Sequence, residues 1–385
     1  MREGWEYKRL GELCDIVMGQ SPMGNSINEN NGIEFHQGKT NFGDKFLMES
    51  GIYTTSPIRI AEKKTILLCV RAPVGIINIT ERQVCIGRGL SSLKPRLGLE
   101  LLYLYYCLLS KQNYFESNST GSTFKAISSK VINNTIIQFP PKPTQLSIVS
   151  ELDKLNELIQ IKKEQLKDYD ALAQSIFYEM FGDPVENEKG WEVKKLGELC
   201  SKIGSGATPR GGNESYKDEG ISLIRSLNVY NNEFRRKDLA YIDDEQAAAL
   251  SNVTILEDDV LLNITGASVA RCCIVPSDLL PARVNQHVCI IRPFDNVLVP
   301  IFLNKVLTNI SYQIRLLTLA RSKGATREAL PKSVVDSLLV PLPPLSLQQS
   351  FAHKIEQIER QKAEVQKTIT DSETLLAARM QYWFD

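Results

Sequence analysis

The chain has 385 residues, of which 43% are hydrophobic and 23% are charged, as in ordinary globular proteins, and its length suggests two or three domains. Basic and acidic residues number 45 each, so the formal net charge is zero, which argues against a strong non-specific nucleic-acid binder. No run of 18 apolar residues and no apolar segment near Met1 occur, so we expect no transmembrane helix, no secretory signal and a cytoplasmic location.

The charge is unevenly distributed along the chain. Residues 1–144 hold 17 basic and 12 acidic residues, whereas residues 145–189 hold 5 basic and 10 acidic residues. The acidic residues therefore concentrate in one segment, and the first part of the chain is left basic.

The sequence contains an internal repeat. The eleven residues Gly4–Cys14 recur as Gly190–Cys200 with nine identities, and the segment GSTFKAI at 121–127 is echoed by GATREAL at 324–330. Between these anchors the two halves differ. This pattern is typical of one scaffold, present twice, that carries two different variable surfaces.

The same order of elements is expected in each copy. Apolar, β-branched runs predict strands, and a short helix and a proline-rich break follow them, because proline lacks an amide donor and can open a helix. In the two copies these elements are strands at 65–70 and 260–264, helices around 100–112 and 299–309, and breaks at 140–143 and 341–344.

A long helix is predicted after each break. From Ile148 and from Phe351, apolar residues recur at alternating spacings of three and four for four or more heptads, with no interior glycine or proline. The 36 residues from Gln145 to Met180 would extend for roughly 54 Å as a helix. We expect the two helices to pack on each other in an antiparallel pair, and the alternative is that each helix packs on its own globular domain.

The motifs of common enzymes are missing. The three histidines, His36, His287 and His353, belong to no HExxH sequence, no phosphate-binding GxxxxGK[ST] loop occurs, and Gly204–Pro209 is best interpreted as a turn. The eight cysteines form no CxxC pair and lie in apolar runs, so we expect buried free thiols rather than a zinc site. The sequence therefore predicts no catalytic residue, no metal and no cofactor, and it favours a binding or architectural protein.

The duplicated unit resembles the specificity subunit of type I restriction–modification systems over essentially all 385 residues. The resemblance rests on the GWE.K.LGELC start, the variable body, the G-[SA]-T loop, the proline-rich break and the long heptad helix. It implies an α+β fold with two pseudo-twofold-related α/β target recognition domains, separated by an antiparallel coiled coil of two long helices. The corresponding segments are recognition domains at 1–144 and 183–345 and spacer helices at 145–182 and 346–385.

The resemblance also implies a function. Each recognition domain would read one half of a bipartite, asymmetric double-stranded DNA target, and the helices would set the spacing and dock two DNA methyltransferase subunits. Restriction endonuclease subunits would join the full complex, no membrane is involved, and the chain itself would be non-catalytic. The alternatives are the recognition subunit of a type IIB-like system, a coiled-coil scaffold that binds only proteins, and a complete nuclease or methyltransferase, for which a motif is missing.

Candidate DNA-contact residues are polar or basic side chains at strand ends and in Gly/Ser/Thr-rich loops, where polar groups reach outward. The segment IGRGL at 86–90 parallels VNQHV at 284–288, so Arg88 and Gln286 occupy matching places with different chemistry. In the first copy the candidates are Lys39, Arg71, Arg88, Ser122, Thr123 and Lys125. In the second copy they are Arg225, Arg271, Asn285, Gln286, His287, Lys323, Thr326 and Arg327.

Overall fold

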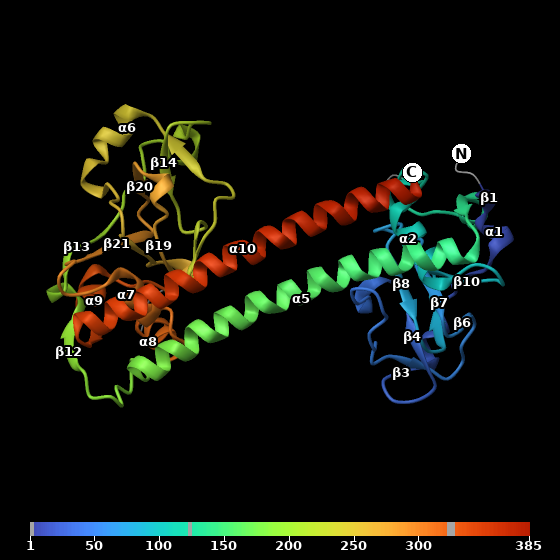
Figure 1. Cartoon of the computed structure of the whole chain (residues 1–385), viewed down its shortest axis with the longest axis horizontal. Helices are drawn as coiled ribbons and strands as arrows, with labels where there is room; N and C mark the ends of the chain where they lie inside the picture. The colour runs from blue at the N-terminus through green and yellow to red at the C-terminus, as the bar shows by residue number, and fades with distance from the viewer. Residues whose placement is uncertain (1–3, 122–124, 322–327) are drawn as a thin grey trace. The chain divides into compact units, whose positions relative to one another are not determined.

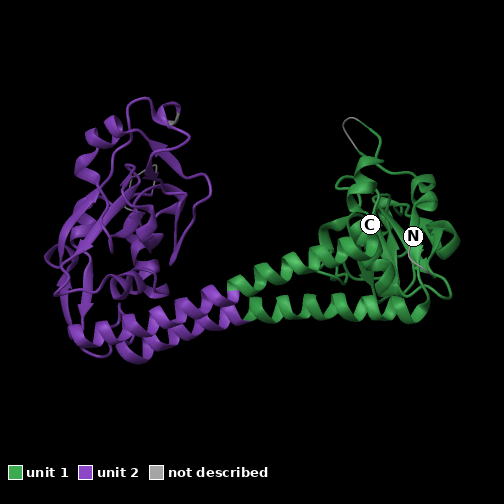
Figure 2. Ribbon diagram, turned by 45° about the horizontal axis from the view of Figure 1, so that its top comes forward, with its two compact units in different colours: residues 1–164, 366–385 green, residues 165–365 purple. Residues whose placement is uncertain are grey.

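The computed structural model describes residues 4–121, 125–321 and 328–385 and contains two compact units, drawn in different colours in Figure 2. One unit comprises residues 1–164 and 366–385, and the other comprises residues 165–365. Each unit holds one globular domain together with part of each of the two long helices. We call residues 6–139 the first domain and residues 192–342 the second domain.

The first domain is built on strands that are mostly antiparallel, together with short helices (Figure 1). Its elements are β1 (Glu6–Arg9), α1 (Leu10–Leu13), β2 (Cys14–Met18), β3 (Ile27–Asn28), β4 (Ile33–His36), β5 (Tyr53–Thr54), β6 (Ile60–Ala61), β7 (Thr65–Cys69), β8 (Ile77–Thr80), β9 (Val84–Ile86), β10 (Leu90–Pro95), α2 (Leu101–Ser110), α3 (Gln112–Ser117), α4 (Ser129–Asn134) and β11 (Ile136–Phe139). The strand orders are β2-β10-β7-β8, β3-β5-β4-β9-β6 and β1-β11. The predicted strand and short helix appear here as β7 and α2.

The second domain repeats this plan with additions. Its elements are β12 (Glu192–Lys195), β13 (Cys200–Ser205), β14 (Ile221–Ile224), β15 (Val229–Tyr230), β16 (Glu233–Phe234), β17 (Ala240–Ile242), α6 (Asp244–Ala249), β18 (Val260–Asn263), β19 (Cys272–Ile274), β20 (Ala282–Val284), β21 (Val288–Pro293), α7 (Pro300–Leu307), α8 (Ile310–Ala320), α9 (Lys332–Asp336) and β22 (Leu339–Leu342). The order β13-β21-β18-β19 matches β2-β10-β7-β8, and the parallel pair β14-β20 matches the parallel pair β4-β9. The expected α+β class, with two copies of one domain, is confirmed.

The cores form where the sequence is most apolar. All five residues of β7 are buried, and one face of α2 packs on β7, β8 and β10. Tyr103 of α2 is fully buried and donates its hydroxyl to Gln138 O at 3.0 Å, and Tyr312 of α8 is likewise buried and donates to Leu339 O at 3.0 Å. The shared core thus includes a polar contact to the last strand of each domain.

The long helices are α5 (Lys142–Phe181) and α10 (Leu345–Phe384), each of 40 residues. The first begins at Lys142 rather than at Gln145, because Pro143 lies in the first turn, where no amide donor is needed. Although they are the longest helices, neither they nor any other helix in the described ranges is long and apolar enough to cross a membrane.

The two helices pair antiparallel in each unit. In the first unit Lys163 Nζ lies 2.8 Å from Glu373 Oε1, and the Glu151 carboxylate binds the Arg379 guanidinium. In the second unit Lys362 Nζ lies 2.8 Å from Asp170 Oδ1. The predicted seam is therefore a helix–helix contact.

The C-terminal ends of the two helices also pack on the domains, but each end packs on the domain of the other copy and not on its own, as the alternative expected. Phe384 is fully buried in the first domain, and Trp383 stacks on Trp5 with ring centroids 6.2 Å apart. Phe177 and Phe181 are buried in the second domain, although the heptad spacing placed Ile176 and Met180 on the seam. The last turns of α5 face the domain core, so the helical face that is buried changes there.

The eight cysteines are buried free thiols, as the sequence predicted. Burial raises the pKa of Cys14 to about 12, and it raises the pKa of Cys107 to about 12 as well. These thiols therefore stay protonated at neutral pH and act as small apolar core residues.

Candidate nucleic-acid interface

Five backbone segments of the first domain meet where β2, β4, β7 and β9 end and β10 begins. Gln20 N donates to Ile86 O at 2.9 Å, Gly87 N donates to His36 O at 2.8 Å, Val70 N donates to Gly89 O at 2.9 Å, and Ile127 N donates to Val70 O at 3.0 Å. We call residues 19–22, 36–39, 70–72, 86–90 and 125–127 the first loop cluster.

The second domain builds the same cluster with the same hydrogen bonds. Ala207 N donates to Val284 O at 3.2 Å, Asn285 N donates to Ile224 O at 3.0 Å, Ile264 N donates to His287 O at 3.0 Å, and Leu330 N donates to Ile264 O at 2.8 Å. We call residues 206–209, 224–227, 264–266, 284–288 and 328–330 the second loop cluster. The segments 86–90 and 284–288, which were aligned from the sequence, are therefore structurally equivalent.

A glycine begins the first segment of each cluster. A Cβ atom on Gly19 would lie 2.2 Å from Gly87 O, and one on Gly206 would lie 1.9 Å from Val284 O. Only glycine fits such a close approach of two backbones. The repeated signal, Gly-x-Ser/Thr-Pro at 19–22 and 206–209, is present in the sequence, but the second copy was predicted only as a turn. Ser21 and Thr208 were therefore not among the predicted residues.

The first loop cluster exposes four cations. The predicted residues Lys39, Arg71, Arg88 and Lys125 lie on four of its five segments, and all four are exposed. No ion pair joins any of them to a carboxylate in the part of the chain that the structure describes. Arg71 and Lys125 lie on paired segments, since Arg71 bridges Ala126. Predicted residues Ser122 and Thr123 lie outside the described residues.

The second loop cluster is more polar than cationic. His287 and Arg271 line a groove of about 400 Å³ together with Tyr230, Thr265 and Ser268. The Arg271 guanidinium lies 4.2 Å from the centroid of the Tyr230 ring, which fixes its plane. Tyr230 and Thr265 were not predicted, because nothing in the local sequence shows that they approach Arg271 and His287.

The remaining second-copy predictions differ in exposure. Gln286 is exposed, Arg225 is half-buried and donates to Asp238 O, and Asn285 is only 6% exposed. The Asn285 side chain accepts the His287 backbone N–H at 3.1 Å, so it shapes the turn that carries Gln286. Predicted residues Lys323, Thr326 and Arg327 lie outside the described residues.

Equivalent positions in the two clusters differ in charge. Arg71 and Thr265 are equivalent, because they bridge Ala126 and Ala329 respectively. Lys125 O accepts from Ala72 N at 3.1 Å, just as Glu328 O accepts from Gly266 N at 2.9 Å. Each of these two cations of the first domain is thus replaced, at the equivalent position of the second domain, by a neutral or an acidic residue.

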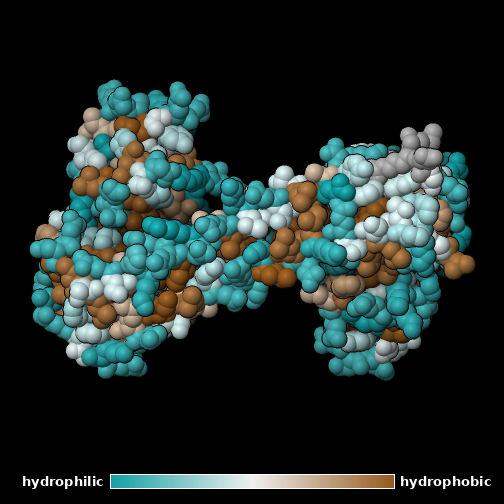
Figure 3. All heavy atoms as spheres, in the orientation of Figure 1, coloured by the Kyte–Doolittle hydropathy of each residue, from teal (hydrophilic) through white to brown (hydrophobic). Residues whose placement is uncertain are grey.

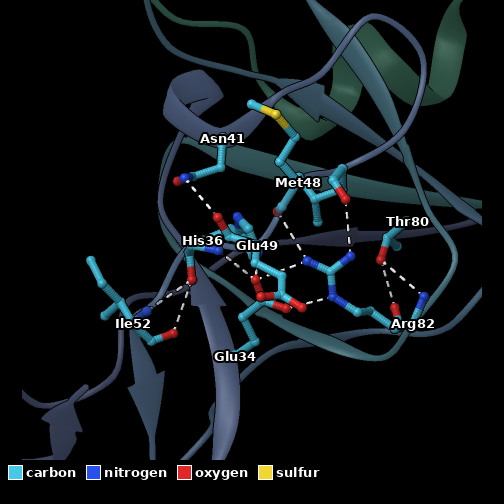
Figure 4. Close-up of polar contacts among 10 residues, drawn as sticks. Glu34, His36, Asn41, Met48, Glu49, Ile52, Thr80 and Arg82 are labelled. Carbon is cyan, nitrogen blue, oxygen red and sulfur yellow. Dashed lines mark hydrogen bonds and ion pairs between the residues drawn. The ribbon is translucent and has the colours of Figure 1, made fainter. Parts of the chain in front are cut away.

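A buried ion cluster supports the strand that leads into residues 36–39 (Figure 4). Glu34 accepts hydrogen bonds from Arg82 Nε at 2.5 Å, from Ser50 N at 2.6 Å and from His36 Nε2 at 3.0 Å. Arg82 also donates to Leu47 O at 2.9 Å, so it ties the loop before β5 to β4. The cluster therefore fixes the base of the first loop cluster.

The electrostatics of this cluster favour a charged glutamate. Burial alone would raise the pKa of Glu34, but the hydrogen bonds from Arg82 and Ser50 outweigh it and lower the pKa to about 2. Burial lowers the pKa of His36, against the attraction of Glu34, so His36 is neutral at neutral pH.

A cavity also opens along the long helices of the first unit. Its volume is about 760 Å³, and its lining includes Glu151, Leu155, Leu158, Leu375 and Arg379. Leu158 and Leu375 are 38% and 49% exposed, and Figure 3 shows apolar residues at the surface of the helices. An apolar strip between polar helix faces is suited to protein contact.

Within the described ranges, no group of three or more His, Cys, Asp or Glu side chains is arranged to hold a metal ion.

Comparison with known proteins gives one consistent result. The profile of the family described as "Type I restriction modification DNA specificity domain" matches residues 2–168 and 188–372. The putative type I restriction enzyme MjaX specificity subunit of Methanocaldococcus jannaschii is 34% identical over 178 residues, which is 45% of this chain and 42% of that protein. The MjaIX specificity subunit of the same organism is 28% identical over 236 residues, 53% of each chain. The chain thus spans about half the length of these curated relatives.

Solved structures share the fold. The type I restriction–modification S subunit from M. genitalium has a TM-score of 0.59 at 16% identity, covering 99% of this chain and 96% of its own. A chain from a structural study of complex assembly and conformational transition of the type I R-M system has a TM-score of 0.65 at 18% identity, covering 100% and 98%. The fold therefore extends over the whole chain.

Proposed function

The chain belongs to the type I restriction–modification DNA specificity family, and from this membership we propose that it is the non-catalytic subunit that selects the DNA sequence for such a complex. Each domain reads one half of a bipartite target on double-stranded DNA. One observation carries the proposal: both domains build the same loop cluster from the same backbone hydrogen bonds but equip it with different side chains.

The different side chains make the target asymmetric. The first cluster presents Lys39, Arg71, Arg88 and Lys125, whereas the second presents Gln286 and His287, with Arg271 in the adjoining groove. Base edges in the major groove differ in their donors and acceptors, so different side chains on one scaffold read different bases. The exposed cations of the first cluster are also suited to phosphate contacts, which position a protein on the duplex.

The partners in this proposal are those of the family. The helices dock two DNA methyltransferase subunits, and restriction endonuclease subunits join the full complex in the cytoplasm. The apolar cavity lined by Leu155, Leu158 and Leu375 supports the helices as a docking surface. A partner that supplies further phosphate contacts would also account for a specificity subunit with zero net charge.

Selection of bound sequences tests this proposal. The chain, assembled with the methyltransferase encoded beside it, is incubated with a pool of random DNA, and the bound fraction is sequenced. We expect two unlike half-sites at a fixed separation. We also expect no methyl transfer from S-adenosylmethionine by the chain alone. Methylation without a partner, or no enriched sequence in the complex, would refute the proposed function.

A further inference from the structure

Arg88 and Gln286 occupy the same position of the same tight turn. Leu90 N donates to Gly87 O at 3.0 Å in the first domain, and Val288 N donates to Asn285 O at 3.2 Å in the second. Arg88 and Gln286 are each the second residue of this turn, and both are exposed. The side chain at this position therefore projects from the same place in each loop cluster.

The turn is supported from the same side in both domains. Ser21 and Thr208 are equivalent, since the glycines two residues before them donate to Leu90 O and Val288 O. The Ser21 hydroxyl accepts the backbone N–H of Arg88 at 3.4 Å, and the Thr208 hydroxyl donates to Gln286 Oε1. In the second domain the hydroxyl therefore binds the Gln286 side chain, whereas in the first domain it binds the backbone of Arg88.

Both ends of the Gln286 amide are held. Its Nε2 lies 3.5 Å from His287 Nε2, and because an amide nitrogen only donates, this histidine nitrogen is the acceptor. On the other side of the ring, His287 Nδ1 lies 2.6 Å from Thr265 Oγ1. The chain Thr208–Gln286–His287–Thr265 thus fixes which end of the amide is the acceptor and which is the donor.

Both the oxygen and the nitrogen of the Gln286 amide can still form one further hydrogen bond. Oε1 has a second lone pair, and Nε2 has a second hydrogen. An acceptor next to a donor is complementary to the adenine major-groove edge, which offers the N6 amino group and N7. A fixed amide loses little rotational freedom on binding, so the preference is built in before DNA arrives.

Resting on the proposed function, we propose that the position of Arg88 and Gln286 is a base-reading position of each domain, with Gln286 reading an adenine and Arg88 a guanine. Arg88 fits the second role because its exposed guanidinium carries two parallel N–H donors, which match the guanine O6 and N7 acceptors. Because the two positions are equivalent, both assignments concern the same position of the repeated domain and are tested together.

The test exchanges the two side chains. Bound sequences are selected from random DNA with the chain in complex with its methyltransferase, for the native chain, Gln286→Arg and Arg88→Gln. Gln286→Arg should change one position of one half-site from adenine to guanine, by about tenfold in relative enrichment, and leave the other half-site unchanged. Arg88→Gln should make the converse change in the other half-site.

Two further variants control the interpretation. Thr208→Val removes the hydroxyl that holds the amide and should weaken the adenine preference without replacing it by another base. Gln83→Arg, at an exposed site of the first domain outside the first loop cluster, should change neither half-site. Sequence-specific binding that survives Gln286→Arg with an identical target would overturn the inference and leave the proposed function intact. Loss of all enriched sequences with the native chain would instead count against the proposed function.

Discussion

Gln145 and Gln348, the first-turn glutamines of the two long helices, make the same three hydrogen bonds in their two domains. Gln145 accepts from Glu100 N at 2.9 Å and donates to Gly98 O at 3.0 Å and Pro140 O at 2.9 Å. Gln348 accepts from Val299 N at 2.9 Å and donates to Val297 O at 3.2 Å and Pro343 O at 2.9 Å. Both side chains are fully buried. Each glutamine joins the start of a helix to the loop before the short helix of its own domain.

Gln145→Ala should therefore destabilise the first unit by about 3 kcal/mol, because three hydrogen bonds are lost and buried backbone groups are left without partners. Denaturant unfolding followed by tryptophan fluorescence measures the change, since Trp5 and Trp383 stack in this unit. Gln348→Ala should have an effect of similar size in the second unit. The exposed Gln160→Ala should leave the midpoint unchanged, and an equal loss there would show that the buried contacts are not the cause.

Acid should destabilise the first domain through Glu34 and His36. The pKa of Glu34 is about 2 in the folded protein, whereas its ordinary value is 4.5. Its contribution to the free energy of unfolding is therefore complete above about pH 4.5 and is lost as the pH falls toward 2. Burial lowers the pKa of His36 below its ordinary 6.5, so protonation of the unfolded chain adds to the loss below about pH 6.5. Unfolding measured from pH 7 to pH 3 should show a falling free energy of unfolding.

The variant Glu34→Gln separates this cluster from general acid effects. It should lower the free energy of unfolding at pH 7 by about 3 kcal/mol, and its pH dependence should be flatter than that of the native chain. Glu81→Gln, at an exposed site beside Arg82, should leave the native pH dependence unchanged. A native slope retained in Glu34→Gln would contradict the role given to this carboxylate.

The salt dependence of DNA binding should lie mainly in the first domain. Arg71→Gln and Lys125→Gln each remove an exposed cation of the first loop cluster. If each contacts a phosphate, each should reduce the slope of log K against log salt by about 0.9. Binding of the complex at several salt concentrations measures this slope. Lys130→Gln, at an exposed site outside the cluster, should leave the slope unchanged, and equal changes in all three variants would indicate a diffuse charge effect.

The length of the helices should set the spacing of the half-sites. Seven residues inserted after Leu166 in α5 and after Gln366 in α10 would preserve the ion pairs Lys163–Glu373 and Lys362–Asp170 on either side. The helices would lengthen by about 10 Å, which corresponds to about three base pairs of B-DNA. Selection from a library with randomised spacers should give a longer spacer and the same half-sites. An unchanged spacer in a folded, extended variant would show that partner subunits set the distance.

The features that could be predicted from the sequence are the internal repeat and the periodic spacing of apolar residues. The matching of Gly4–Cys14 with Gly190–Cys200 predicted two copies of one domain, and the apolar spacing from Ile148 predicted the seam of the long helices. The offset of 203 residues that aligns GSTFKAI with GATREAL also aligns Gln145 with Gln348, although only the structure shows that both are buried and make the same contacts.

The rest depends on contacts between residues far apart in the sequence. Arg82 and Glu34 lie 48 positions apart, and Thr265 and His287 lie 22 apart, so no local pattern reveals either pair. Asn285 is a residue type that can bind base edges, yet it is buried, because its side chain accepts a hydrogen bond from the His287 backbone N–H within the turn. The heptad spacing did not predict the burial of Phe177, because Phe177 contacts both Phe351 of α10 and Phe302 of the domain core.

The most direct measurement of the central claim is an exchange of one domain. Residues 15–120 are replaced by the matching segment of a related subunit with a known and different target, and the sequences bound by the complex are selected from random DNA. We expect one half-site to become that of the donor, while the other half-site and the spacer length stay as they were. A change in both half-sites, or in neither, would contradict the conclusion that each domain reads one half of the target.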